Sequence, residues 1–211
     1  MSRDVTIEGL LNEALALLQR PGRHFIAIAG APGSGKSTTA DDLLSRLVAV
    51  HPSAAAILPM DGFHFDDAVL HARGRHPWKG APDTFDVGGL ASTLRRLDAR
   101  DEAAVAVPVF DRSLEISRGS ARLIDRSVRL IIVEGNYLLL KDTPWSHLAP
   151  LFDLTVMIVA PEPVLAERLR ARWVSFNLTE AQIMEKLEAN DLPNGRVVGR
   201  QSRASDLVLH Q

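Results

Sequence analysis

The chain has no cysteine among its 211 residues, and this absence excludes several kinds of chemistry at once. Disulfide bonds, thiolate metal sites and cysteine nucleophiles all need that side chain, and a chain without it suits a reducing compartment. An excess of charge of one sign is also lacking, because 24 Lys and Arg residues offset 26 Asp and Glu residues to leave a net charge of −2. This balance does not favour nucleic acid as a partner, and it leaves a small anionic ligand open.

Long apolar runs are missing too, since no uncharged stretch approaches the roughly 18 residues of a membrane-spanning helix. Near the N-terminus, apolar residues recur at helical spacing rather than as a continuous block: Ile7, Leu10, Leu11, Ala14, Leu15 and Leu18. This pattern predicts an amphipathic helix that ends at Arg20-Pro21-Gly22, and not a signal peptide. We therefore expect a cytoplasmic protein with no membrane partner.

What the chain does contain is a motif for binding phosphate. The segment Gly30-Ala31-Pro32-Gly33-Ser34-Gly35-Lys36-Ser37 matches the pattern G-x-x-x-x-G-K-[ST]. It follows an apolar run at 25–29 that predicts a buried strand, and it precedes a helical pattern at 38–48. Glycines let successive N–H groups turn toward a phosphate, and the helix directs the positive end of its dipole to the same point. We expect this loop and Thr38 to bind the phosphates of a nucleotide, with Lys36 at the β- and γ-phosphates and Ser37 holding Mg²⁺.

The remaining patterns alternate between strands and helices. Apolar runs predict strands at 54–60, 105–110, 130–133, 154–159 and 206–210. Helical patterns occur at 161–173 and 179–190, and Asp86 is placed to cap a further helix that carries Leu90, Leu94 and Leu97. The polar stretch 64–84 is expected to be irregular. We predict one α/β domain over residues 1–211, in three layers with a mostly parallel central sheet flanked by helices.

Two carboxylates directly follow predicted strands. Asp61 comes after the run that ends at Met60, and Glu134 comes after Val133. Because ligands gather at the carboxyl ends of parallel strands, we expect both side chains beside the phosphate loop. There Asp61 could accept the proton of an acceptor hydroxyl, and Glu134 could hold Mg²⁺ directly or through water. The alternatives are a turn residue before Gly62 for Asp61 and a solvent-facing strand end for Glu134.

Arginines form two groups. Arg168, Arg170 and Arg172 lie on the predicted helix at 161–173, where Arg168 and Arg172 share a face and could close over the phosphates as a lid. The alternative is a solvated helix face on which these arginines pair with acids such as Glu167. The second group is typical of an exposed helix or ribbon edge, and it comprises Arg118, Arg122, Arg126 and Arg129. From this group only Arg118 is kept as a candidate contact of an acceptor.

Histidines and aromatic residues gather between 64 and 85. The spacing of His64, His71 and His76 matches no standard zinc pattern, and no cysteine supports a metal site there. His64 lies close after Asp61 and is therefore a candidate contact of the substrate. Three aromatic residues either line the acceptor pocket or simply pack this segment: Phe65, Trp78 and Phe85.

Taken together, these segments resemble those of the P-loop small-molecule kinases, a family that includes uridine kinase, phosphoribulokinase and bacterial pantothenate kinase. The resemblance implies the P-loop NTPase fold. The resemblance runs from His24 to Leu209. It rests on the phosphate loop and on four further segments, at 60–64, 81–86, 107–111 and 133–137. Within the family, the segments 61–64, 79–86 and 134–140 are similar to the signature of the nucleoside-kinase-like proteins called fructose transport system kinases.

The resemblance implies particular roles. Asp61 would be the catalytic base, Asp83 would bind the acceptor, and Arg118 would stand where uridine kinases have the arginine of a His-Ser-Arg segment. Arg168 and Arg172 would belong to a lid helix at about 162–175, and the acceptor would bind within about 61–118.

Departures from the family pattern fall on the acceptor side. Where uridine kinases have a tyrosine after the Pro-Val pair, this chain has Phe110, and Ile116-Ser117 precedes Arg118 in place of the histidine. Asp111-Arg112 also lacks the histidine of the Tyr-Ser-His segment of pantothenate kinases. These differences weaken a pyrimidine-binding interpretation and leave the acceptor without a name.

The leading hypothesis is an ATP- and Mg²⁺-dependent kinase that phosphorylates a hydroxyl of a small metabolite, such as a sugar, a nucleoside or a pantothenate-like compound. The alternative is an ATP-dependent switch or regulatory module without such an acceptor. GTP specificity is not expected, because the chain contains no Asn-Lys-x-Asp segment. A homodimer is left open.

Overall fold

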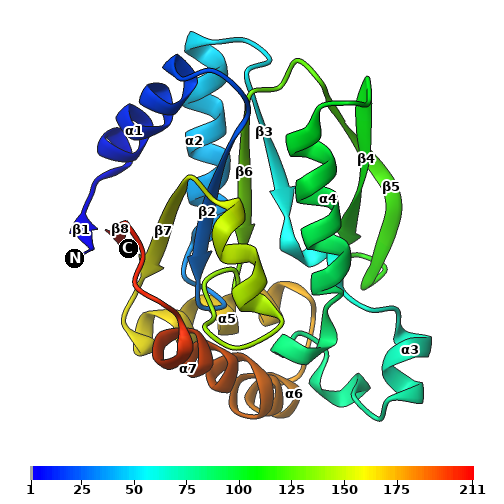
Figure 1. Cartoon of the computed structure of the whole chain (residues 1–211). Coiled ribbons are helices and arrows are strands. Elements are labelled where there is room, and N and C mark those ends of the chain that lie inside the picture. The colour runs from blue at the N-terminus through cyan, green and yellow to red at the C-terminus, as the bar shows by residue number, and fades with distance from the viewer. Residues whose placement is uncertain (1) are drawn as a thin grey trace.

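A six-stranded sheet lies at the centre of the computed structural model, which describes residues 2–211 (Figure 1). Its strands are β1 (Arg3–Asp4), β2 (His24–Gly30), β3 (Ala55–Pro59), β6 (Leu130–Gly135), β7 (Leu154–Val159) and β8 (Leu207–His210). They lie in the order β1-β8-β7-β2-β6-β3, and every neighbouring pair is parallel. The mostly parallel sheet predicted from the sequence is confirmed, and the carboxyl ends of its strands meet at one edge.

The strand β2 lies between β6 and β7 and is buried along its whole length. Because successive side chains of a strand point to opposite faces, Phe25, Ala27 and Ala29 enter one hydrophobic core. Ile26 and Ile28 enter the other. A strand buried on both faces reads as a continuous apolar run, which is why this strand is visible in the sequence.

Helices cover both faces of the sheet (Figure 1). They are α1 (Ile7–Gln19), α2 (Lys36–Val50), α3 (Asp67–Ala72), α4 (Val87–Ala99), α5 (Glu162–Ser175), α6 (Glu180–Lys186) and α7 (Leu192–Gln201). On one face, α1 and α2 contribute Leu10 and Leu43 to the core. On the other face, α4 and α7 contribute Leu94 and Val198. The three layers expected from the sequence are present.

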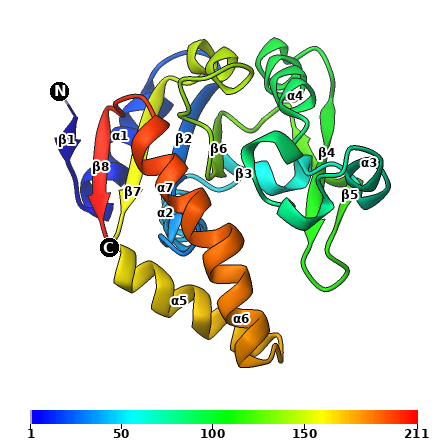
Figure 2. The same ribbon diagram turned by 90° about the horizontal axis from the view of Figure 1, so that it is seen from below.

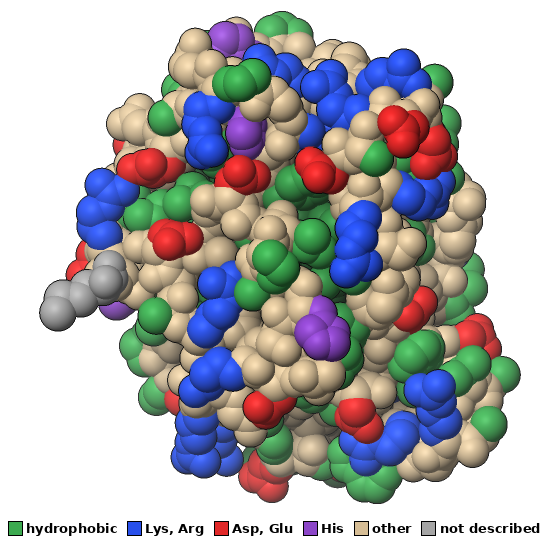
Figure 3. Space-filling model, viewed as in Figure 1, with side chains coloured by type: hydrophobic (Ala, Val, Ile, Leu, Met, Phe, Trp, Pro, Cys, Tyr) green, Lys and Arg blue, Asp and Glu red, His purple; other side chains and the backbone are tan. Residues whose placement is uncertain are grey.

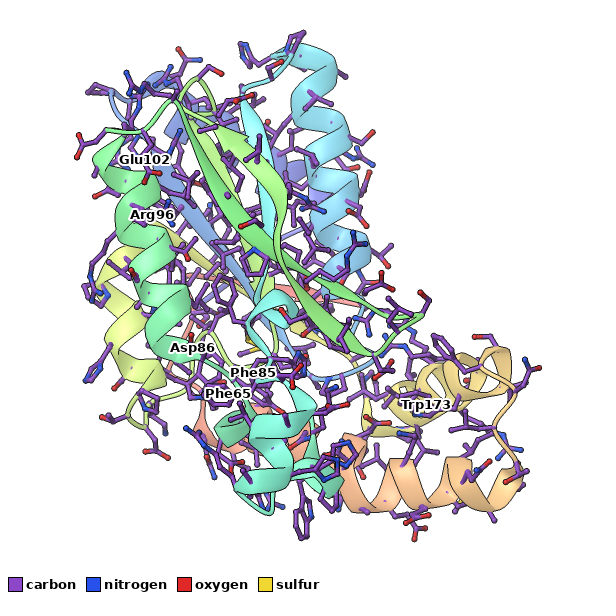
Figure 4. All side chains as sticks on the ribbon, turned by 90° about the vertical axis from the view of Figure 1, so that its right-hand side faces the viewer. Phe65, Phe85, Asp86, Arg96, Glu102 and Trp173 are labelled. Carbon is purple, nitrogen blue, oxygen red and sulfur yellow. The ribbon has the colours of Figure 1, made fainter. Side chains whose placement is uncertain are left out.

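The start of α4 follows from ordinary capping. Asp86 accepts a hydrogen bond from the Gly89 N–H at 2.8 Å, and this satisfies one of the free donors of the first helical turn. The predicted cap is confirmed. It ties α4 directly to the preceding loop, so that Phe65 and Phe85 lie at the foot of this helix (Figure 4).

An antiparallel hairpin of β4 (Ala104–Asp111) and β5 (Ile116–Asp125) packs beside the sheet. The run predicted at 105–110 becomes β4, whereas the basic stretch after it becomes a strand that the sequence patterns do not indicate. Within β5 only Ile124 is buried and most other side chains are exposed, so the strand lacks apolar alternation. The turn of this hairpin, residues 112–115, proves important for the site.

Two further elements differ from the prediction. The stretch 64–84 is not wholly irregular, because Asp66 caps the short helix α3 inside it. The helix predicted at 179–190 divides into α6 and a π-helical turn, Leu187–Asp191, and α7 then follows. Pro193 lies in the first turn of α7, where proline is tolerated, but Gly195 and Gly199 lower the helix propensity, so tertiary packing holds the helix in place. In Figure 2, α5 and α6 project below the strands and α7 runs back toward β8.

The surface shown in Figure 3 mixes Lys and Arg side chains with Asp and Glu side chains. This mixture matches the near-neutral net charge. Over residues 2–211, no helix is long and apolar enough to cross a membrane.

Candidate active site

The phosphate loop joins the buried strand β2 to α2. Gly33 and Gly35 have φ angles of 79° and 90°, a left-handed conformation that glycine adopts without strain. Helix α2 begins at Lys36 with Gly35 at its N-cap, and neither a capping side chain nor an acid in the first turn occupies its N-terminal N–H groups. These donors and the helix dipole therefore face the concavity of the loop, where a phosphate fits.

A pair of oxygen ligands lies beside the loop. The Ser37 hydroxyl donates a hydrogen bond of 3.0 Å to Glu134 Oε2, and Glu134 is only 7% exposed at the end of β6. Burial raises the pKa of Glu134, and the charge of Lys36 partly offsets this rise. A hydroxyl and a carboxylate at this spacing are the kind of oxygen donors that Mg²⁺ prefers, so these two residues fit a metal ion bound to phosphate.

Asp61 lies in the 3₁₀ turn that follows β3. Strand register places Pro59 opposite Glu134, so both carboxylates stand at the same edge of the sheet, as predicted. Burial acts to raise the pKa of Asp61, but the charges of His64, Lys36, Arg112 and Arg172 outweigh it and hold the pKa below its ordinary value. Asp61 is thus an ionised carboxylate among cations.

His64 is fixed against Asp61 at the start of the segment 64–86, which is named the acceptor loop after its predicted role. Its Nδ1 lies 2.8 Å from the Asp61 carbonyl oxygen, so this nitrogen carries the proton and donates it. The imidazole packs between Phe85 and Phe110, with ring centroids at 4.0 and 4.8 Å. Burial lowers the pKa of His64, although the charge of Asp61 acts in the opposite direction. The wall beside Asp61 is therefore aromatic and rigid.

Two predicted acceptor contacts lie in ion pairs. Asp83 accepts a hydrogen bond from Arg75 at 2.9 Å, and Arg118 donates one of 3.2 Å to Asp111. Both side chains are more than half exposed, and neither contacts Asp61. Of the three aromatic residues, Phe85 is buried, whereas Trp78 is 44% exposed.

The predicted lid helix α5 lies against the phosphate loop. Leu165 and Leu169 of α5 pack with Ile183 and Leu187 in a small core of their own, which Ala31 of the loop also contacts. The side chain of Trp173, seen on this projecting helix in Figure 4, donates to Asp191 at 2.7 Å.

The three arginines of α5 differ in their surroundings. Arg172 lies near Asp61 and is half-buried, and burial lowers its pKa. Arg168 reaches the Gly33 carbonyl oxygen at 3.5 Å. Arg170 instead pairs with Glu180 on the surface, at 2.6 Å from Nη2 to Oε2. Only Arg172 and Arg168 are therefore placed toward the site.

A hydrogen-bonded link joins the lid to the acceptor loop. Asn190, in the π-helical turn, donates to the Lys79 carbonyl at 2.9 Å, and Asn194 donates to Asn190 at 2.8 Å. The Tyr137 hydroxyl donates to the neighbouring Gly80 carbonyl at 2.6 Å. Turns of π-helix frequently occur at functional sites. The π-helical turn is therefore the one local feature that points to this link.

Arg112 is the other site residue that the sequence patterns do not indicate. It lies on the turn of the β4–β5 hairpin and forms an ion pair of 2.8 Å with Asp61. The two residues are 51 positions apart, and the hairpin register alone brings them together. No motif spans such a distance.

Two cavities flank the phosphate loop. One of about 460 Å³ lies between α2, β3 and the hairpin, and its lining includes Ser37, Asp61, Phe110, Arg112 and Glu134. The other, of about 610 Å³, opens beside Ala31 and Pro32 and is lined largely by β7 and α7. Ligand sites commonly have volumes of about 300–1,000 Å³, so each can hold a small molecule. Within residues 2–211, no group of three or more His, Asp or Glu side chains is arranged to hold a metal ion.

Parallel strands, a glycine-rich loop at the end of the central strand and carboxylates at neighbouring strand ends define an α/β protein built to bind phosphate. No family model matches the chain. It is 34% identical to the uncharacterised YggC protein of Escherichia coli K12, over 99% of this chain and 95% of that one. It is 31% identical to a provisionally named uridine kinase of Schizosaccharomyces pombe, over 96% of this chain and 89% of that one.

A solved structure agrees with these relatives. The crystal structure of a provisionally named fructose transport system kinase from Silicibacter sp. TM1040 is 36% identical, with a TM-score of 0.89 over 97% of this chain and 98% of that one. The chain belongs to the P-loop small-molecule kinases, the family of uridine kinases, phosphoribulokinases and pantothenate kinases. The family resemblance seen in the sequence is confirmed, and the protein is a phosphotransferase.

Proposed function

We propose that this protein transfers the γ-phosphate of ATP to a hydroxyl group of a small metabolite. The observation that carries the proposal is the convergence of the phosphate loop, Glu134 and Asp61 at one edge of the sheet. A nucleotide switch needs the first two of these features but has no use for a half-buried, ionised Asp61 that faces an aromatic wall. A kinase uses all three.

Donor binding rests on backbone groups and on Lys36. The N–H groups of residues 33–38 hold the phosphates, and Lys36 neutralises charge between the β- and γ-phosphates. Ser37 and Glu134 would hold Mg²⁺, which supplies positive charge to the phosphate oxygens when it is bound. The cavity beside Ala31 and Pro32 lies where the nucleoside would leave the loop.

Asp61 and the lid act on the transfer itself. Asp61 accepts the proton of the acceptor hydroxyl and orients the oxygen in line with the phosphate. Arg172, with Arg168 behind it on the same face of α5, stabilises the charge that spreads over the transferred group. His64 forms the wall of the acceptor site, and Asp83 and Arg118 would reach the acceptor after release from their ion pairs.

A screen of hydroxyl compounds tests the proposal. Purified protein with ATP and Mg²⁺ should release ADP only when a suitable sugar, sugar phosphate, sugar acid, nucleoside or pantothenate is added. The Lys36→Met variant serves as the background, because it lacks the cation that the transfer requires. ADP release that ignores every added compound and responds to a protein partner would instead favour a switch.

A further inference from the structure

The ion pair between Arg112 and Asp61 occupies one oxygen of the carboxylate that the proposed reaction uses. Asp61 must accept a hydrogen bond from the acceptor hydroxyl, yet Arg112 Nη2 lies 2.8 Å from its Oδ2. A guanidinium in this place also weakens Asp61 as a base, since it contributes to the low pKa of that carboxylate. An acceptor that draws Arg112 away from Asp61 would therefore free this carboxylate for the hydroxyl and strengthen it as a base.

The backbone that carries Arg112 is held in place, so its side chain alone has freedom to move. Asp111 Oδ1 accepts hydrogen bonds from the N–H groups of Ser113 and Leu114 and so fixes the start of the turn. Ser117 donates to the Gly62 carbonyl and ties the hairpin to the turn of Asp61. Arg112 itself is 51% exposed and extends over Phe110, with its guanidinium 5.9 Å from the ring centroid.

The cations around Asp61 divide by their position. Lys36 belongs to the phosphate loop and Arg172 to the lid, so both serve the transferred phosphate under the proposed function. Arg112 belongs to the β4–β5 hairpin, which is part of neither the phosphate loop nor the lid. When an alcohol takes its place at Asp61, this guanidinium loses its partner unless the acceptor brings a negative charge of its own.

We infer that the acceptor is an anionic hydroxy compound whose carboxylate or phosphate group pairs with Arg112. This inference rests on the proposed kinase function and specifies its substrate class. The oxyanion takes the planar guanidinium from Asp61, frees that carboxylate for the hydroxyl, and so couples acceptor recognition to activation of the base. Besides Asp61 and Glu134, the acid that lines the same cavity is Asp41, one helical turn beyond Ser37 on α2.

Matched pairs of acceptors test the inference. ADP release with glycerate is compared with ADP release with glycerol to test for a carboxylate. The same comparison of fructose 1-phosphate with fructose tests for a phosphate. For the charged member of the effective pair, Arg112→Gln should lower kcat/KM by about 10- to 100-fold, the effect of losing one charged hydrogen bond. The same variant should leave the neutral member unchanged or improved, because Asp61 is released. Arg112→Lys keeps the positive charge but loses the two parallel N–H donors of the guanidinium, so it should restore only part of the lost kcat/KM.

Arg96→Gln is the matched control. Arg96 forms an ion pair of 2.7 Å with Glu102 and is 47% exposed, much like Arg112, but it lies at the far end of α4 (Figure 4). The Arg96→Gln variant should keep the preference of the wild type for charged acceptors. In the wild type, activity with the neutral members that equals or exceeds activity with the charged members overturns the inference and leaves the kinase function intact. An equal loss on both members in Arg112→Gln does the same. If neither these pairs nor any other compound of the screen supports ADP release, the proposed function fails and this inference fails with it.

Discussion

The donor side and the acceptor side of this site are built in different ways. On the donor side, one contiguous segment after the buried strand β2 supplies backbone N–H groups, and Glu134 is nearly buried beside Ser37. On the acceptor side, side chains from a loop, a hairpin and the lid form ion pairs that stay partly exposed, such as Arg112 with Asp61. The first arrangement suits a constant ligand, and the second suits a ligand that varies among relatives.

This difference has an energetic basis. Backbone donors on a rigid strand–helix junction need no reorganisation when phosphate binds. Exposed ion pairs each contribute little to stability and can exchange partners at small cost. The acceptor side can therefore change its specificity through a few substitutions, while the donor side cannot.

The largest expected effect separates the lid arginines. Arg172→Gln should reduce kcat by about 10³-fold or more if Arg172 stabilises the transferred phosphate, as arginine fingers do. Arg170→Gln is the control, because Arg170 pairs with Glu180 on the surface of the same helix and should leave kcat nearly unchanged. Steady-state ADP production measures both. Similar rates for the two variants would remove Arg172 from the mechanism.

A smaller effect tests the buried oxygen pair. Glu134→Gln keeps the shape of the side chain but removes its charge, so the Mg²⁺ concentration for half-maximal activity should rise by about 10- to 100-fold. Ser37→Ala should act in the same direction, and the double variant should lose less than the sum because the two residues share one function. An unchanged Mg²⁺ dependence in both variants would show that the metal ion binds elsewhere.

Breaking the hydrogen-bonded link between the lid and the acceptor loop should reduce activity modestly. Asn190→Ala removes the hydrogen bond of 2.9 Å between Asn190 Nδ2 and the Lys79 carbonyl oxygen. This hydrogen bond ties the acceptor loop to the π-helical turn. We expect a loss of about 2- to 10-fold in kcat/KM for the acceptor, the worth of one neutral hydrogen bond. Glu188→Ala, on the exposed side of the same π-helical turn, is the control. Equal values for the two variants would leave Asn190 without a role in positioning.

The smallest effect is a shift with pH. The base role proposed for Asp61 requires an ionised carboxylate, and neighbouring cations hold the pKa of Asp61 below the ordinary value. Removing one of them in Arg112→Gln raises the pKa of Asp61, so the acidic limb of kcat/KM should move to higher pH. The profile is measured with one acceptor for both proteins. A limb that stays in place, or moves to lower pH, would contradict this account of the field around Asp61.

The same contrast governs what the sequence could predict. The loop, β2, the Asp86 cap and the meeting of Asp61 with Glu134 follow from a contiguous motif, buried apolar runs and the geometry of parallel strands. Arg112 was missed because β5 has almost no buried side chain to reveal its register. The link through Asn190 was missed because the helical pattern at 179–190 does not reveal that this helix ends in a π-helical turn.

Replacing Asp61 with Asn tests the central claim most directly. The change keeps the size of the side chain and removes its ability to accept a proton. ATP binding and acceptor-dependent ADP formation should be measured side by side in the variant and the wild type. We predict a loss of about 10²- to 10⁴-fold in turnover, the usual contribution of a general base. The Kd for ATP should stay within about twofold, because Asp61 serves the acceptor and not the donor. Unchanged turnover in Asp61→Asn would contradict the account.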